Sequence, residues 1–229
     1  MTSAVVIIRP EPGLAATAAE AEKIGISTVA APLFIIESRR WEAPAPDRID
    51  ALLIGSANAI RHGGDALEAF REKPVYAVGE STAQSARGAG FQIAQTGEGR
   101  LQNLLDGLAG QSLRLLRLAG EEHVPVTAPA GIELVTRVDY ASVAQPMPGS
   151  LAATLAAGAV VLLHSAAAAR HFASECDRLG VERSHVALAA LAPRIAEAAG
   201  HGWQAIQTAS APTDAALLAL ARDMCHFAP

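Results

Sequence analysis

The stretch Gly55-Ser56-Ala57-Asn58-Ala59-Ile60-Arg61-His62 decides the fold, because the chain contains it a second time. It returns as His164-Ser165-Ala166-Ala167-Ala168-Ala169-Arg170-His171. Each copy follows an apolar run of strand length, Ala51–Ile54 before the first and Ala159–Leu163 before the second. An apolar run that leads into a small-residue loop and then a helical segment is typical of a βα unit.

The repetition extends on both sides of this stretch. Downstream, residues 90–96 (GFQIAQT) are matched by residues 202–208 (GWQAIQT), and upstream residues 5–9 (VVIIR) are matched by residues 113–117 (LRLLR). A period this long exceeds that of any solenoid repeat. The sequence therefore predicts two domains of one fold, with a ligand-binding cleft between them.

Composition narrows the class of protein. Of the 229 residues, 51% are hydrophobic and 18% are charged, which favours folded domains over disordered tails. The formal net charge is -5, Lys and Arg form no run, and only 4% of residues are aromatic. Nucleic acid is therefore not expected as a partner.

The cysteines and the absence of a leader predict a compartment. Cys176 and Cys225 lie far apart and outside any metal-ligand spacing, and no signal peptide precedes Val5. We expect a reducing cytoplasm, no disulfide framework and no metal site. Residues 140–163 carry no charge and could be taken for a membrane span, but prolines and glycine interrupt them and alanine dominates the rest, so no membrane association is expected.

Short β-rich runs alternate with alanine-rich segments of helix length. The pattern predicts α/β domains, each a doubly wound parallel sheet covered by helices on both faces. Residues 35–38 and 139–145 break this rhythm and are expected to be extended connectors between the domains. The predicted strands are residues 4–8, 27–31, 51–54, 75–78, 113–116, 133–138, 159–163 and 186–189.

Four loops that follow predicted strands are candidates for anion binding. In parallel sheets ligands lie beyond the carboxyl ends of the strands, where helix N-termini offer free N–H groups. Ser, Thr and Asn also cap helices for structural reasons, Arg9 could simply reach solvent, and His164 could be a satisfied strand-end histidine. The candidates in these loops are Arg9, Ser56, Asn58, Gly79, Thr82 and Ser165.

Tyr140 is a candidate of another kind, because the chain has only two tyrosines and this one lies in a predicted connector. A phenol there could donate a proton or a hydrogen bond to a leaving oxygen, or it could pack between the domains. Signatures of nucleotide cofactors and of a hydrolase nucleophile are missing: the chain has no G-x-G-x-x-G after its first strand, no G-x-x-x-x-G-K-[ST] and no G-x-S-x-G.

Short motifs are spread over nearly the whole chain. They are IIRP at 7–10, APL at 31–33, IE at 36–37, LIGSANAI at 53–60, VYAVGESTA at 75–83, VDY at 138–140, LLHS at 162–165 and SAPT at 210–213. Taken in order, these motifs resemble the uroporphyrinogen-III synthase family. No single motif is diagnostic, and the resemblance rests on their order, spacing and repetition.

The resemblance implies two similar α/β domains joined by a pair of extended strands. The first domain would comprise residues 1–36 and 146–229, and the second residues 37–145. Members of the family cyclise hydroxymethylbilane to uroporphyrinogen III, with loss of water and inversion of ring D through a spiro intermediate, in tetrapyrrole and heme biosynthesis. We therefore expect a cofactor-independent lyase, monomeric and cytoplasmic, that receives its substrate from hydroxymethylbilane synthase.

Carried over to this chain, the family's motifs give Tyr140 as the group that assists departure of the hydroxyl, and Ser56, Thr82 and Ser165 as hydroxyls of the cleft. The chain departs from the family at residues 191–194 (LAPR), where Gly and Thr are usual, which suggests that Arg194 binds substrate there instead. Gly55 also stands where Thr is common. A noncatalytic two-domain protein that senses a tetrapyrrole or another polyanion is the alternative.

Overall fold

The computed structural model describes residues 4–226, which form two α/β units. Unit 1 comprises Met1–Ile35 and Val143–Pro229, and unit 2 comprises Ile36–Ser142. The division lies one residue before the first domain boundary expected from the sequence and three residues before the second. Residues 1–3 and 227–229, which the sequence assigned to the first domain, lie outside the described residues.

Unit 1 is built on a five-stranded sheet with the order β11-β10-β9-β1-β2, in which every neighbouring pair is parallel. Its three central strands are apolar and almost entirely buried, as expected of a sheet covered on both faces. The strands are β1 (Ala4–Ile7), β2 (Thr28–Ala30), β9 (Ala159–Leu163), β10 (Val186–Ala190) and β11 (Ala205–Thr208).

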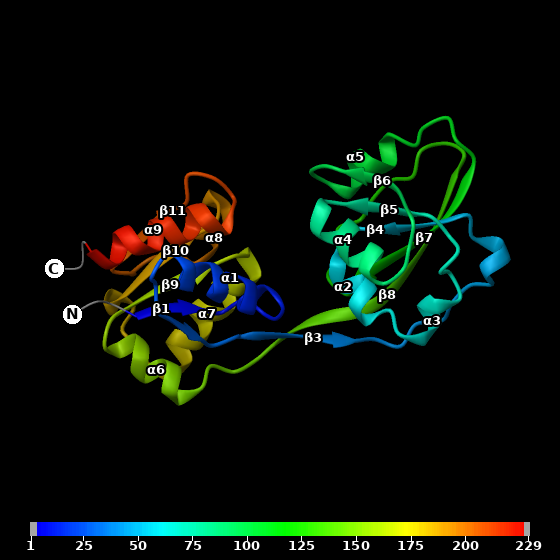
Figure 1. Ribbon diagram of the computed structural model, residues 1–229. Coiled ribbons are helices and arrows are strands. Elements are labelled where there is room, and N and C mark those ends of the chain that lie inside the picture. The colour runs from blue at the N-terminus through cyan, green and yellow to red at the C-terminus, as the bar shows by residue number, and fades with distance from the viewer. Residues whose placement is uncertain (1–3, 227–229) are drawn as a thin grey trace. The chain divides into compact units, whose positions relative to one another are not determined.

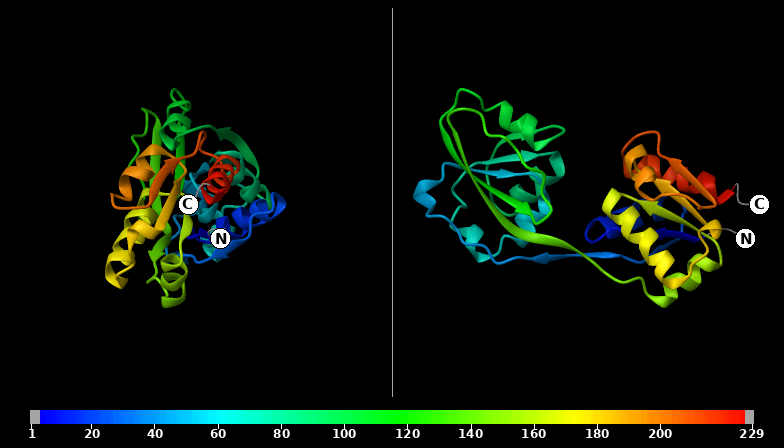
Figure 2. Two further views of the ribbon diagram at one scale, coloured as in Figure 1. Left: turned by 90° about the vertical axis from the view of Figure 1, so that its left-hand side faces the viewer. Right: turned by 180° about the vertical axis from the view of Figure 1, so that it is seen from behind.

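Helices cover the two faces of this sheet. The side chains of α1 (Gly13–Lys23) and α9 (Asp214–His226) pack on one face, which carries Val5 and Ile7 of β1. The opposite face, with Val6 and Ile8, is covered by α6 (Gly149–Ala156), α7 (Ala166–Leu179) and α8 (Pro193–Ala198). In the view from behind, α7 lies in front of the sheet, whereas α9 is prominent in Figure 1 (Figures 1 and 2).

Unit 2 carries a six-stranded sheet with the order β3-β8-β7-β4-β5-β6 (Figure 1). The pairs from β8 to β6 are all parallel. Helices α2 (Ala57–His62), α3 (Asp65–Glu68) and α4 (Glu80–Gly88) pack on one face, and α5 (Leu101–Asp106) packs on the other. The strands are β3 (Phe34–Ser38), β4 (Ala51–Ile54), β5 (Val75–Val78), β6 (Ile93–Gly97), β7 (Leu113–Gly120) and β8 (Ile132–Ala144).

The two sheets have the same strand order once the repeated segments are aligned. The order β2-β1-β9-β10-β11 of unit 1 corresponds to β8-β7-β4-β5-β6 of unit 2, and β3 is added at the edge of unit 2. The repeat predicted from the sequence is therefore confirmed in the fold. Each unit joins the first part of one repeat to the second part of the other, which explains why unit 1 contains both ends of the chain.

All eight predicted strands are present. The predicted connectors are extended: residues 35–38 lie within β3, and residues 139–144 of the second lie within β8, which ends one residue before Gln145. Strands β6 and β11 were not predicted, although both lie in repeated segments of the sequence. Each is an edge strand with a half-exposed, partly polar sequence, so neither carries the continuous apolar run of a central strand. The remaining short elements are two 3-10 helices, Pro46–Arg48 and Arg183–His185.

A β-bulge in β8 sets the direction of Tyr140. Ala119 of β7 pairs with Val138 and Gly120 pairs with Tyr140, so Asp139 is an additional residue in β8. Val135 and Tyr140 both pack against the face covered by α2 and α4, although strict alternation would place residues five positions apart on opposite faces. The bulge therefore keeps Tyr140 on the face of the sheet that α2 and α4 cover.

Candidate functional site

The candidate residues of unit 2 lie at one edge of its sheet. Strands β4, β5 and β7 are parallel, and they end at Ile54, Val78 and Gly120. Ser56 lies two residues after the first end, Gly79 follows the second directly, and Tyr140 lies opposite the third. The tertiary structure thus brings the unit 2 candidates to the edge where ligands bind in parallel sheets.

Ser56 and Ser165 both act as helix caps. The Ser56 Oγ accepts a hydrogen bond from the backbone N–H of Asn58 at 3.2 Å, and the Ser165 Oγ accepts one from Ala168 at 3.1 Å. The capping interpretation that the sequence left open therefore holds for both hydroxyls. Asn58, in the first turn of α2, accepts a hydrogen bond from Arg61 at its Oδ1.

The N-terminus of α4 differs, because no side chain caps it. Gly79 occupies the N-cap with a φ of +78°, a conformation that favours glycine, and its N–H donates to the Gly97 carbonyl at 2.9 Å. Thr82 is 5% exposed and faces the core of the unit rather than serving as the cap. The N–H groups of the first turn of α4 are thus not used by a capping side chain.

Tyr140 is half-buried against the backbone of Gly120. A Cβ atom on residue 120 would lie 2.8 Å from Tyr140 Cε2 and 3.1 Å from its hydroxyl oxygen, so only glycine allows this ring position. His62, the last residue of α2, is a neighbour of this ring, with the two ring centroids 6.3 Å apart. The phenol predicted from the sequence therefore has an imidazole as its neighbour.

Asp139, the bulge residue, is completely buried beside Tyr140 in the sequence. Its backbone carbonyl accepts a hydrogen bond from the Arg39 N–H at 2.7 Å, but neither carboxyl oxygen has a hydrogen-bond partner among the described residues. Burial raises the pKa of Asp139 from 3.8 to about 7. A buried carboxyl without partners is costly in its charged form, so it holds its proton to near neutral pH.

In unit 1, four polar side chains from separate segments meet at the corresponding sheet edge. The Asp214 carboxylate accepts a hydrogen bond from Thr17 at 2.7 Å and pairs with Arg9 Nη1 at 3.0 Å. His164 Nε2 lies 3.4 Å from Asp214 Oδ1, an electrostatic contact without the angle of a formed hydrogen bond. Arg9 is thus engaged by a carboxylate within its own unit.

This surrounding holds the carboxyl of Asp214 in its charged form. The contact with His164, followed by the Thr17 hydroxyl and the Arg9 charge, lowers the pKa of Asp214 from 3.8 to about 2, against the opposing effect of burial. The group links β1, α1, β9 and the start of α9. We infer that it fastens the C-terminal helix to the strand ends of unit 1.

We expect Asp214→Asn to lower the free energy of unfolding by about 2 kcal/mol at neutral pH. Because the folded-state pKa is depressed, the contribution is complete above about pH 4 and is lost as the pH falls toward about 2. Urea unfolding of wild type and variant between these pH values measures it. Asp223→Asn, an exposed change on the same helix, is the control, and a deficit that does not shrink with falling pH would contradict the assignment.

The remaining candidate of unit 1, Arg194, has no polar partner among the described residues. Arg194, the second residue of α8, is exposed, and its guanidinium makes no hydrogen bond or ion pair with the described residues. It follows β10, so it lies at the same sheet edge as Arg9 and Ser165. Its charge is accordingly available to an anion.

Sequence reasoning did not single out His62, Ser38 or Asp214 as site residues. A signal was present for two of them, since His62 ends the repeated stretch and Asp214 follows the capping residue Thr213. His62 and Asp214 become site candidates only through contacts with residues that are distant in the sequence. Ser38 carried no signal in the sequence.

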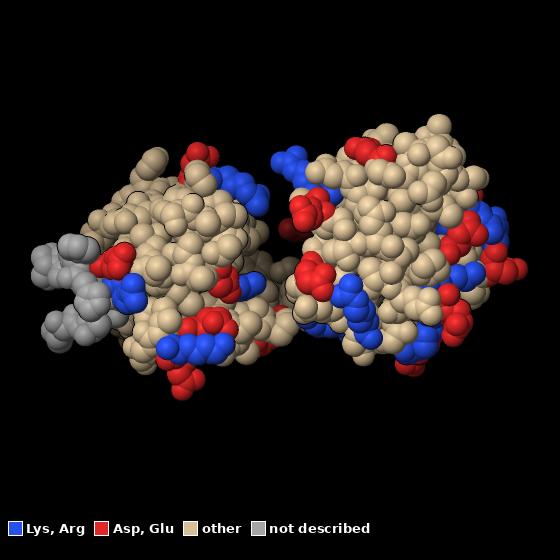
Figure 3. Space-filling view, turned by 45° about the horizontal axis from the view of Figure 1, so that its top comes forward, with Lys and Arg blue, Asp and Glu red and all other residues tan. Residues whose placement is uncertain are grey.

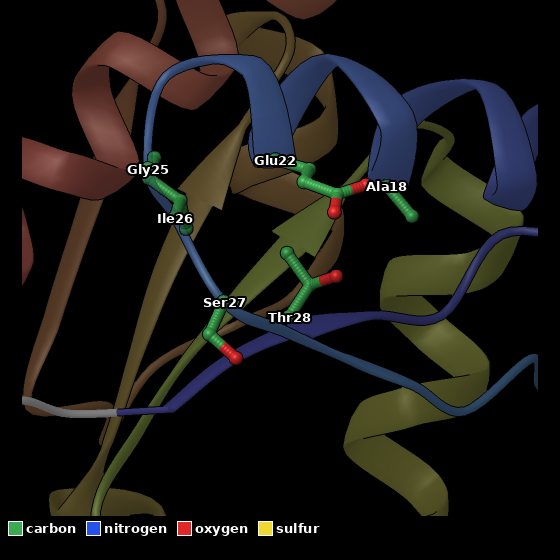
Figure 4. A pocket seen from close by; sticks show the side chains of 6 residues that line it. All are labelled: Ala18, Glu22, Gly25, Ile26, Ser27 and Thr28. Carbon is green, nitrogen blue, oxygen red and sulfur yellow. The ribbon is translucent and has the colours of Figure 1, made fainter.

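Pockets lie on both sides of β2 in unit 1, and no candidate residue lines either of the two described next. The larger, of about 400 Å³, lies between the C-terminal half of α1 and β2, where Glu22 and Thr28 extend toward each other (Figure 4). The smaller, of about 270 Å³, lies between β2 and α6. On the face drawn in Figure 3, acidic and basic side chains are interspersed, without a continuous patch of one sign.

No three His, Cys, Asp or Glu side chains among residues 4–226 converge closely enough to hold a metal ion. None of the helices in this range combines the length and the apolar character needed to cross a bilayer.

Comparison with known proteins decides the family. The sequence model of uroporphyrinogen-III synthase HemD matches residues 15–219. The chain belongs to the uroporphyrinogen-III synthase family. The fold agrees: uroporphyrinogen-III synthetase from Helicobacter pylori superposes with a TM-score of 0.67 at 16% identity, covering 97% of this chain and 99% of that one.

A mutant uroporphyrinogen III synthase from Thermus thermophilus superposes with a TM-score of 0.55 at 17% identity, again over 97% and 99% of the two chains. A search of curated proteins finds no match. Membership of the uroporphyrinogen-III synthase family supports cyclisation of hydroxymethylbilane to uroporphyrinogen III, in tetrapyrrole biosynthesis, as the activity of this enzyme. The noncatalytic sensor is not favoured.

Proposed function

We propose that Tyr140 assists departure of the substrate hydroxyl in this cyclisation, and that strand-end residues of both units bind the substrate carboxylates. The observation that carries the proposal is the position of Tyr140, which lies at the sheet edge of unit 2 that also bears Ser56 and Gly79. A phenol can donate a proton to a leaving hydroxyl, so that the oxygen departs as water.

The reaction needs no nucleophilic side chain, because the substrate supplies its own nucleophile. Loss of the hydroxyl leaves an electrophilic azafulvene, the substituted carbon of ring D attacks it to give the spiro intermediate, and fragmentation with recombination inverts the ring. The protein must hold the substrate in the reactive conformation. A cofactor-independent mechanism is part of the proposal.

Binding must overcome the net charge of -5 on the protein. The first turn of α4, which no side chain caps, offers N–H groups, and the free guanidinium of Arg194 offers a positive charge. Ser56, Asn58, Gly79 and Thr82 follow strand ends of unit 2, and Arg9 and Ser165 follow strand ends of unit 1; all six stay in the proposed binding set. For Arg9, a substrate carboxylate would have to compete with Asp214.

We also propose that the enzyme is cytoplasmic and monomeric, and that hydroxymethylbilane reaches it from hydroxymethylbilane synthase. The mixed surface charge supports a role without nucleic acid. Sedimentation of the purified protein at working concentration would report its oligomeric state.

The test is product analysis with the purified protein and enzymically generated hydroxymethylbilane. Without a synthase the bilane closes spontaneously to the type I isomer. We expect an excess of the type III isomer, separated chromatographically after oxidation to the porphyrin. A product mixture identical to that of the protein-free control would overturn the proposed function.

A further inference from the structure

Three elements of unit 2 bring Ser38, His62 and Tyr140 into one group. His62 Nδ1 lies 3.1 Å from the Ser38 Oγ of β3, and its ring lies 6.3 Å from the Tyr140 ring with the planes inclined by 36°. Nε2 makes no hydrogen bond with the described residues. Because a hydroxyl can donate or accept, Ser38 holds the imidazole through one nitrogen and leaves the other for proton exchange.

The surroundings of His62 favour its neutral form. Burial, followed by the charge of Arg61, lowers its pKa below 6.5. Asp139 is buried, and Glu133 of β8 is exposed. The other charged groups on the elements around His62 are paired with one another or bonded to backbone. They are Glu37, Arg39 and Glu121; Glu80 and Arg87 of α4; Asp50 and Arg114; Arg117, bonded to the Val124 carbonyl; and Arg137, bonded to the Glu42 carbonyl.

The reaction needs a proton acceptor as well as a donor. The hydroxyl gains one proton to leave as water. At ring closure, the ring D carbon that carries hydrogen in the substrate forms the new carbon–carbon bond and must then lose that hydrogen as a proton. The two electrons of its C–H bond return to the pyrrole ring and restore aromaticity. One proton therefore enters the reaction at its start and one leaves at its end.

We propose that His62 is the catalytic base that accepts this last proton at Nε2, with Ser38 as the positioning residue that fixes its ring. Tyr140 donates the first proton and His62 removes the last, so the pair returns to its starting state once a proton passes back to the phenol through solvent. This inference rests on the proposed function of Tyr140 and adds a second group to the same site.

The internal repeat provides a matched control. His171 of unit 1 occupies the position of His62 in the second copy of the repeat. Its Nε2 lies 2.7 Å from the Gln145 carbonyl oxygen, and its ring packs edge-on against Phe34 at 5.2 Å. The same residue type at the same repeat position thus contacts neither a phenol nor a serine hydroxyl.

The experiment compares His62→Gln, Ser38→Ala and His171→Gln with wild type, using hydroxymethylbilane with either hydrogen or deuterium at the free α-carbon of ring D. We expect His62→Gln to lower kcat by roughly tenfold or more, at or below the usual range for a general base. Because C–H cleavage then becomes slow, the isotope effect on kcat should rise above that of wild type. The decline of kcat on the acidic side should also be lost.

Ser38→Ala should show the same changes at smaller size, and His171→Gln should keep the kcat and isotope effect of wild type. A folded His62→Gln enzyme, verified by circular dichroism, with a wild-type isotope effect would overturn the proposal, as would equal effects of His62→Gln and His171→Gln. Failure of wild type to form the type III isomer would overturn the proposed function instead, so the two failures are distinguishable.

Discussion

Replacement of Tyr140 by phenylalanine is expected to lower turnover by roughly ten- to a hundredfold and to leave uroporphyrinogen III as the product. The phenylalanine ring fills the same space against Gly120, so the packing that the glycine permits is retained. Only the hydroxyl that donates the proton is removed. The bilane can still ionise slowly unaided, which limits the loss. Initial rates with enzymically generated substrate, together with isomer analysis, measure both quantities.

Tyr76→Phe is the matched control, because Tyr76 is the other tyrosine and packs against the opposite face of the unit 2 sheet. It should leave turnover unchanged. Unchanged turnover in Tyr140→Phe would reduce Tyr140 to a packing residue. A switch to the type I isomer would mean instead that the hydroxyl orients ring D.

Asp139→Asn is expected to stabilise the protein at pH 8 and to have little effect near pH 4. The folded-state pKa is raised, so the folded protein keeps a proton that the unfolded chain releases between about pH 4 and 7. The free energy of unfolding of wild type therefore falls across this window, and above it the full cost of the buried charge remains. The gain in the variant at pH 8 is on the order of 3 kcal/mol. Urea unfolding at several pH values measures it.

The control for this change is Asp47→Asn, which removes an exposed carboxylate from the same unit. The asparagine variant keeps the additional residue of the bulge, so we expect Tyr140 to stay in place and the type III product to persist. A stability difference that is independent of pH would show that the Asp139 carboxyl is not buried in its charged form.

Much of the fold followed from local pattern. The buried central strands read as continuous apolar runs, and the repeat of residues 55–62 at 164–171 identified two related α/β units. The edge strands β6 and β11 were not predicted, because a half-exposed strand has no continuous apolar run. The family resemblance pointed to Tyr140. His62 became a candidate only because the tertiary structure places its ring beside the Tyr140 ring.

By itself, the sequence determined which segments become strands and helices, that they occur twice, and which strand ends carry small polar residues. These are consequences of side-chain periodicity and helix capping, which act over a few residues. Tertiary structure decided the pairing of each half repeat with the other, the engagement of Arg9 by Asp214, and the face on which Tyr140 lies. The bulge at Asp139 reverses the alternation expected along β8, and it appears only when β7 supplies the register. Contacts between residues distant in the chain depend on packing, which no local pattern encodes.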